Sequence, residues 1–163
     1  MTTNWIVYVC LAAGVSSALV AGVFQSFSDF VMRSLVAARP AAGVEAMQMI
    51  NRKVFRSSFL VMLLGLAPAS LAFAGYAYFT LSAPALQFII AGAAIYVVFV
   101  FLVTMLGNVP MNKRLDRMDP SAEETAGYWK TYGVMWTRWN HVRTLGSFAA
   151  ALCFLLAAIA LAS

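Results

Sequence analysis

The chain has 163 residues, of which 63% are hydrophobic and only 10% are charged. Soluble domains carry about 25% charged residues, so this composition excludes an ordinary soluble domain and indicates an integral membrane protein. The lipid bilayer is therefore the first partner that we expect for the chain.

Four apolar runs are long enough to cross a bilayer. A transmembrane helix needs about 20 apolar residues, and runs of this length lie at residues 5–27, 58–81, 85–107 and 144–162. Because these spans use most of the chain, we expect one all-α domain, residues 1–163, folded as a bundle of four transmembrane helices.

The net charge of +5 does not indicate a nucleic-acid partner, because the basic residues lie on one side of the predicted topology. All eleven lie between spans one and two, or between span three and the edge of span four. Such loops face the cytoplasm. We therefore expect basic loops in the cytoplasm and both termini outside, in a bacterial inner (plasma) membrane.

In the first span, Gly14, Ala18 and Gly22 follow at four-residue spacing. Small residues at this spacing allow a second helix to approach closely, either within the bundle or in a homo-oligomer. Gln25 and Asp29 continue the same helical stripe. We therefore expect both polar side chains to face the interior of the bundle.

Two further helices are expected at the polar end. After Pro40, the apolar residues Val44, Met47 and Ile50 have helical spacing, which predicts a short amphipathic helix at the cytoplasmic interface.

Before span four, Ser121 and Glu124 match a capping box. A helix from residue 121 to 162 would be about 60 Å long, twice the membrane thickness. It should therefore protrude into the cytoplasm or bend, for example near Gly133.

The stretch WTRWNHVRT, residues 136–144, divides into two helical faces. Arg138 and His141 lie on an outer face suited to lipid head groups, with His141 solvated at the interface. The other face carries Trp129, Tyr132, Trp136, Trp139, Asn140 and Arg143 within an arc of roughly 100°. This second face fits either an aromatic belt with a snorkelling arginine or one wall of a pocket.

Polar groups that end the other spans reach the same depth and extend the pocket hypothesis. These groups are Gln25, Asp29, Asn51, Asn108 and Asn112. Alternatively, Asp29 forms an ion pair with Arg143 or Arg52 that locks the bundle. Pro110 frees a backbone carbonyl that Asn112 can satisfy, so Asn108 is the better pocket candidate of the two asparagines.

The sequence offers little for a metal or redox centre. Cys10 and Cys153 lie inside spans one and four without a Cys-x-x-Cys motif, and His141 is the single histidine. We interpret the cysteines as small buried hydrophobic residues, and we expect no metal site and no cofactor.

Four motifs occur in a specific order: GVFQSFSDFVM (22–32), AMQMINRKV (46–54), NVPMN (108–112) and WTRWNHVRT (136–144). In these motifs the chain resembles, over nearly its whole length, a family of small four-helix membrane proteins. Much of this family is catalogued as a domain of unknown function, and it includes the fungal anthrone oxygenases. Arg33 departs from the pattern, since many relatives are expected to carry proline or a small residue there.

The resemblance implies oxidation of an anthrone to an anthraquinone by molecular oxygen, without metal or flavin. Such a reaction needs a base, donors for an oxyanion and a dry aromatic pocket. Asp29 would be the base, or the partner that orients Arg143. Asn108, Asn140 and Arg143 would hold oxyanions, and Trp136 and Trp139 would stack on a flat substrate. In full, the expected catalytic residues are Asp29, Asn140 and Arg143, the expected substrate-binding residues are Gln25, Asn108, Trp136 and Trp139, and the expected rim residues are Asn51, Asn112 and His141.

Three functions are therefore open. The first is a cofactor-independent oxygenase or oxidoreductase for flat hydrophobic aromatics, such as anthrones or hydroquinones. The second is a non-catalytic membrane protein that binds a lipid, a quinone or another apolar ligand. The third is a membrane assembly subunit that associates through Gly14, Ala18 and Gly22.

Overall fold

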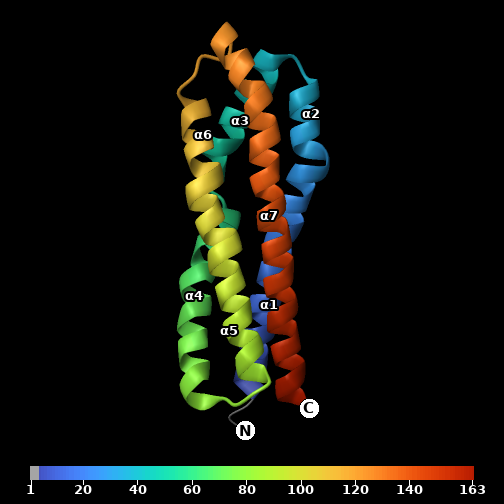
Figure 1. The fold of residues 1–163 in the computed structure, drawn as a ribbon, viewed down its shortest axis with the longest axis vertical. Helices are drawn as coiled ribbons and strands as arrows, with labels where there is room; N and C mark the ends of the chain where they lie inside the picture. The colour runs from blue at the N-terminus through green and yellow to red at the C-terminus, as the bar shows by residue number, and fades with distance from the viewer. Residues whose placement is uncertain (1–3) are drawn as a thin grey trace.

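The computed structural model describes residues 4–163, which form an elongated helical bundle without any β-strand in that range (Figure 1). The all-α prediction is confirmed. The helices are α1 (Asn4–Ser26), α2 (Met32–Ala37), α3 (Pro40–Val54), α4 (Ser58–Thr80), α5 (Ala85–Ile95), α6 (Val109–Asp116) and α7 (Glu123–Ala162).

Wide π-helical turns interrupt two of the long helices. Phe27–Val31 joins α1 to α2, while Tyr96–Leu102 and Thr104–Asn108 lie between α5 and α6. A π-helical turn holds more residues than an α-helical turn and is often found at functional sites. Each such turn therefore rotates the faces that follow it, relative to those of a straight α-helix.

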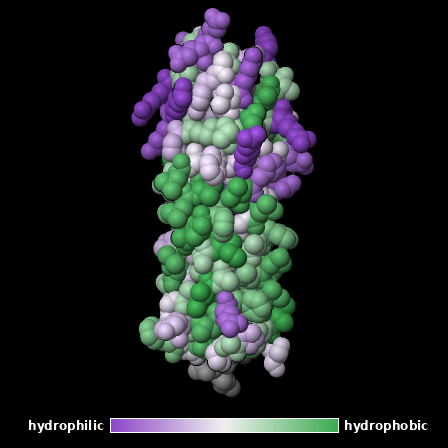
Figure 2. Space-filling view, viewed as in Figure 1, coloured by the Kyte–Doolittle hydropathy of each residue, from purple (hydrophilic) through white to green (hydrophobic). Residues whose placement is uncertain are grey.

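Four helices are long and apolar enough to cross a membrane: Trp5–Ala37, Ser58–Thr80, Ala85–Asp116 and Glu123–Ala162. They contain the four predicted spans, except that the second helix ends at Thr80 and not at residue 81, which supports a membrane protein. Figure 2 shows the apolar surface over the lower part of the bundle and the polar residues gathered at its upper end. That upper end is built from α2, α3, α6 and the start of α7 (Figure 1). Its cytoplasmic location stays a prediction.

Helix α7 forms the spine of the bundle, because it packs along both α1 and α5. Gly14 lets α1 and α7 approach closely, since a Cβ atom there would lie 2.8 Å from Leu155 Cδ2. Ala18 and Gly22 are exposed, and no described atom lies within 4 Å of a Cβ built on Gly22. Of the predicted small-residue stripe, only Gly14 therefore packs inside the bundle.

The structure also corrects the orientation of the polar pair in the first helix. Gln25 and Asp29 are exposed, so the prediction that they face the interior is wrong. The buried polar face instead carries Ser17 and Ser28, in line with Phe24. At 100° per residue this face lies roughly 90° around the helix from the predicted stripe. Four-residue spacing drifts around an α-helix, and only Gly14 lies at the edge of the buried face.

The amphipathic helix predicted after Pro40 is present as α3. Val44 and Met47 are fully buried and belong to one cluster with Leu115 of α6 and Tyr132 of α7. The apolar face of α3 therefore packs on protein, which leaves its location at a membrane interface as a prediction.

Helix α7 begins at Glu123 and continues without interruption through Gly133 to Ala162. The helix has no break at Gly133, and its 40 residues correspond to about 60 Å. The prediction of a capping box at Ser121 and Glu124 is wrong, because the N-cap residue of α7 is Ala122. Ser121 instead donates from its backbone N and from Oγ to Asp119 Oδ1, at 2.9 and 2.7 Å. These hydrogen bonds hold the pKa of the exposed Asp119 carboxyl below its usual value.

Candidate functional site

A cavity of about 200 Å³ lies between α1, α3, α4, α6 and α7. Aromatic rings form much of its wall, namely those of Phe24, Phe27, Phe59 and Trp136. The cavity exceeds the ~150 Å³ that holds benzene in a protein interior, but it is smaller than typical ligand pockets of ~300–1,000 Å³. The cavity therefore suits a small flat aromatic molecule. A tricyclic molecule would fit only if side chains in the wall move to enlarge the cavity.

The most unusual group in this wall is the guanidinium of Arg143, which is 5% exposed. Its Cζ lies 4.1 Å from the ring centre of Phe24 and 5.4 Å from that of Trp136. Nη2 donates to Asn140 Oδ1 at 2.6 Å, and Nη1 donates to Thr104 Oγ1 at 3.4 Å. No carboxylate pairs with Arg143 among the described residues. A buried cation without a counter-charge is energetically costly, so the cavity favours an anionic occupant.

Asn140 orients this arginine from behind the cavity wall. It is fully buried, and its Nδ2 donates to the Phe24 backbone O and to Ser28 Oγ, both at 2.6 Å. These bonds fix the amide so that Oδ1 points to Arg143. Asn140 does not line the cavity. It is therefore a positioning residue that joins α1 to α7.

Trp136 is held in the wall by Asn112. Asn112 Oδ1 accepts a hydrogen bond from Trp136 Nε1 at 2.9 Å and another from the Tyr132 hydroxyl at 2.8 Å. The rings of Trp129, Tyr132 and Trp136 stack along α7, with centres 5.4 and 6.4 Å apart. These three residues are buried. The predicted aromatic face is thus confirmed for this part of the helix.

The two asparagines of the NVPMN motif have the opposite positions to those predicted: Asn112, and not Asn108, lines the cavity. Asn112 lines the cavity, whereas Asn108 is buried away from it and donates from Nδ2 to the Trp136 backbone O at 3.2 Å. The prediction that Asn108 reaches the pocket is therefore wrong. The π-helical turns before residue 109 rotate the helix, and a wheel drawn for a straight α-helix does not include this rotation.

Asn51 of α3 contributes a second polar group to the cavity wall. It is 7% exposed, and its Nδ2 has no hydrogen-bond partner within residues 4–163. The same is true of Nε of Arg143. Buried donors normally have partners. Both residues belong to the cavity wall, but these two donor atoms are themselves buried against protein.

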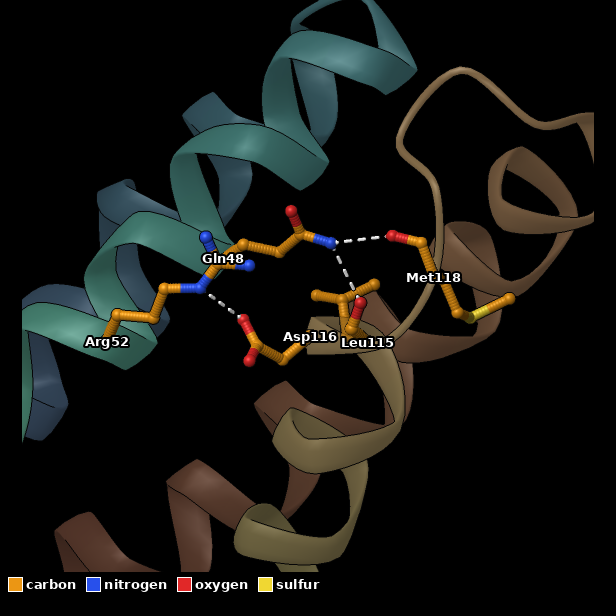
Figure 3. A network of polar contacts seen from close by, with 5 residues as sticks. All are labelled: Gln48, Arg52, Leu115, Asp116 and Met118. Carbon is orange, nitrogen blue, oxygen red and sulfur yellow. Dashed lines mark hydrogen bonds and ion pairs between the residues drawn. The ribbon is translucent and has the colours of Figure 1, made fainter.

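Helix α3 is fastened over the cavity by contacts with α6 and the segment after it (Figure 3). Gln48 Nε2 donates to the backbone O atoms of Leu115 and Met118, both at 2.9 Å. Arg52 Nε lies 2.8 Å from Asp116 Oδ1. The alternative in which Asp29 pairs with Arg143 or Arg52 is therefore wrong. Arg52 and Asp116 both line the cavity, so this ion pair lies at its edge.

Four predicted site residues lie outside the cavity in addition to Asn108 and Asn140, namely Gln25, Asp29, Trp139 and the expected rim residue His141. Gln25 and Asp29 are exposed on α1, and Trp139 is 39% exposed. Trp139 covers Gly107, where a Cβ atom would lie 3.0 Å from Trp139 Cγ. On the helical wheel Trp139 lies about 60° from Trp136, at the edge of the buried face. Trp139 therefore does not line this cavity, and its role in stacking on a substrate stays a prediction.

The outer face of α7 agrees with its prediction. Arg138 and His141 are exposed and do not line the cavity. Their contact with lipid head groups stays a prediction. Residues 4–163 also contain no group of three His, Cys, Asp or Glu side chains that could hold a metal ion.

The sequence reasoning missed several residues of the site. Ser28 and Thr104 bond to Asn140 and Arg143, and Asp116 is the carboxylate in the cavity wall. Ser28 and Thr104 are hydroxyl residues in largely apolar segments, and this signal was available. Asp116 follows a run of basic residues and carries no comparable signal.

The comparisons with known proteins place this site in a family. A model of the family described as anthrone oxygenase matches residues 52–153, which is more than half of the chain and includes Asn112, Trp136, Asn140 and Arg143. The match begins after Asp29. Searches of curated proteins and of solved structures found no match. By this match, which includes the buried Arg143 and the cavity residues Phe59 and Trp136, the chain belongs to the anthrone oxygenase family.

Proposed function

We propose that this protein is a membrane-embedded oxygenase that oxidises flat hydrophobic aromatic compounds of the anthrone or hydroquinone type. One observation carries the proposal: the buried Arg143 guanidinium lies among aromatic rings without a carboxylate partner in the described chain. A cation of this kind stabilises the negative charge that develops on a substrate oxygen. The aromatic walls suit the flat body of such a substrate.

The chemistry requires an electron-rich substrate anion. Removal of a proton from an anthrone gives an enolate, whose carbon reacts with molecular oxygen to form a peroxide. Loss of water from the protonated peroxide gives the quinone, so that one anthrone and one dioxygen yield one anthraquinone and one water. Arg143 stabilises the enolate oxygen, Asn140 positions Arg143, and Trp136 packs on the ring system. This scheme uses no cofactor.

The base in this scheme is Asp116 rather than Asp29. Asp116 is the carboxylate in the described cavity wall, and one of its oxygens is bonded to Arg52. Asp29 is exposed on α1. Asp116 accepts the substrate proton and can release it to solvent, because its side chain is 38% exposed.

A second candidate function is non-catalytic binding of a quinone or another apolar ligand. The observation that favours it is the position of Asp116, whose pairing with Arg52 at the cavity edge leaves the aromatic interior without an acid–base group. In this case Arg143 and Asn51 hold a ligand oxygen, and no bond is broken.

We further propose that the polar end with its basic residues faces the cytoplasm, in a bacterial inner membrane. The apolar substrate then partitions into the bilayer first and reaches the cavity from there.

The test is oxygen uptake by the purified protein in detergent with a chelator present, using anthrone and a panel of hydroquinones. The proposed function predicts protein-dependent oxygen uptake and quinone formation for anthrone. Saturable binding of anthraquinone without any oxygen uptake across the panel would instead select the binding protein.

A further inference from the structure

We propose that the mouth of the cavity binds the head group of an anionic phospholipid, whose acyl chains lie along α4. The mouth consists of the exposed residues of the cavity wall, which are Arg52, Phe55 and Lys113. The inference requires the chain to lie in a membrane, but it does not depend on the reaction in the cavity.

The distribution of charge along the chain is the first argument. Residues 50–60 and 108–117, which include the mouth, contain six basic residues and one acidic residue. This excess of five equals the net charge of the whole chain, +5, so the charges of all other residues cancel. A signal for membrane topology alone could lie anywhere in the loops, whereas a concentration of charge at one place favours an anionic partner there. The six basic residues are all exposed: Arg52, Lys53, Arg56, Lys113, Arg114 and Arg117.

The one acidic residue of these segments leaves donors at the mouth available. Asp116 Oδ1 lies 2.8 Å from Arg52 Nε (Figure 3), and the Arg52 side chain remains 57% exposed. This pair uses only Nε, which leaves the two terminal nitrogens of Arg52 for a phosphate group. Lys113 is exposed in the same cavity wall. Arg52 and Lys113 therefore supply the cationic donors at the mouth.

The surface beside the mouth suits a lipid better than a soluble phosphate. Phe55 stands between Lys53 and Arg56 in the sequence and is 70% exposed. An exposed aromatic ring among basic side chains is typical of a protein surface at the lipid interface.

Helix α4 offers the apolar surface for the acyl chains. It begins at Ser58, directly after the corner that carries Phe55. Only 17% of its apolar stretch is buried in the protein, compared with 33 to 39% for the other three candidate spans. A lipid whose head group lies at the mouth can therefore place its chains on α4, where little protein covers the helix.

The test is native mass spectrometry of the purified full chain in detergent, titrated with phosphatidylglycerol or with phosphatidylcholine of the same acyl chains. We expect tighter binding of phosphatidylglycerol by the wild-type protein. Each basic residue near the head group should contribute about fivefold in affinity, which corresponds to about 1 kcal/mol. The double variant Arg56→Gln with Lys113→Gln should therefore weaken the binding of phosphatidylglycerol about 25-fold and leave that of phosphatidylcholine unchanged.

Two controls separate the mouth from net charge and from a soluble anion. Arg33→Gln with Lys130→Gln also removes two exposed basic residues, but outside the two segments, and should change the affinity for phosphatidylglycerol less than about threefold. Glycerol phosphate carries the anionic group without chains. At the same concentration it should not displace the lipid, because the buried chains add to the affinity.

The inference is overturned if wild-type protein binds the two lipids equally, or if the two double variants lose affinity equally. Displacement of the lipid by an equal concentration of glycerol phosphate would also overturn it, because the ligand would then be a soluble phosphate. A lipid preference at the mouth without any anthrone oxidation would support this inference and contradict only the proposed function.

Discussion

Replacement of Asn140 by leucine is the most informative test of how the site is built. Asn140 makes three hydrogen bonds: its Nδ2 donates to Phe24 O and to Ser28 Oγ, and its Oδ1 accepts from Arg143 Nη2, each at 2.6 Å. Side-chain hydrogen bonds inside membrane proteins contribute about 0.6 to 1.7 kcal/mol each. Loss of all three should therefore lower the free energy of unfolding by about 2 to 5 kcal/mol.

The control for this change is Thr137→Val on the same helix. Thr137 Oγ1 donates to Gly133 O at 2.7 Å, within α7 itself. Loss of this hydrogen bond removes no contact between helices, so it should lower the free energy of unfolding by less than about 1 kcal/mol. Asn140→Asp is a second comparison. It keeps an acceptor for Arg143 but loses the Nδ2 donor, and should lie between the other two variants.

Unfolding in mixed micelles with increasing denaturing detergent, followed by tryptophan fluorescence, measures these differences. Equal stability of Asn140→Leu and Thr137→Val would refute the view that Asn140 joins α1 to α7. Full stability with slower anthrone oxidation would show that Asn140 positions Arg143 without supporting the bundle.

Three further changes test separate features. Gly146→Ala should destabilise the bundle by about 1 to 3 kcal/mol, because the added Cβ would lie 2.6 Å from Phe99 Cβ. Gly65→Ala should be nearly neutral in the same unfolding assay, because no described atom lies within 4 Å of its added Cβ. Gln48→Leu should increase hydrogen exchange in α3 more than Asp116→Asn does. Gln48 is buried with two backbone partners, whereas the Arg52–Asp116 ion pair is largely exposed and contributes at most about 1 kcal/mol. A larger increase in Asp116→Asn would show that the ion pair is the main contact that holds α3 in place. Asp29→Asn should leave anthrone oxidation unchanged, because Asp29 is exposed, and a loss of more than tenfold in its rate would return Asp29 to the site.

The number and order of the long helices were predictable from the sequence, because a run of about 20 apolar residues has few folded alternatives. The confirmed face of α7 was predictable for a related reason. This helix is uninterrupted from Glu123 to Ala162, so 100° per residue stays accurate from Trp129 to Arg143.

The orientation of polar groups on the other helices was not predictable in the same way. Asn108 and Asn112 follow two π-helical turns, which hydrophobic periodicity does not reveal. Asp29 and Gln25 lie about a quarter turn around the helix from the buried face, and an offset of this size decides between burial and exposure. The pairing of Arg52 with Asp116 depends on how α3 packs against α6, and no local pattern records that packing.

The most direct test of the central claim is the rate of anthrone oxidation by wild-type, Arg143→Met and Arg138→Met protein, measured by quinone formation under labelled dioxygen. Removal of a group that stabilises a developing oxyanion lowers rates by about 100- to 1,000-fold. The proposed function predicts a loss of this size in Arg143→Met, a normal rate in Arg138→Met, and one labelled oxygen in the quinone. Equal rates for the two arginine variants would contradict the assignment of this cavity as the place of reaction.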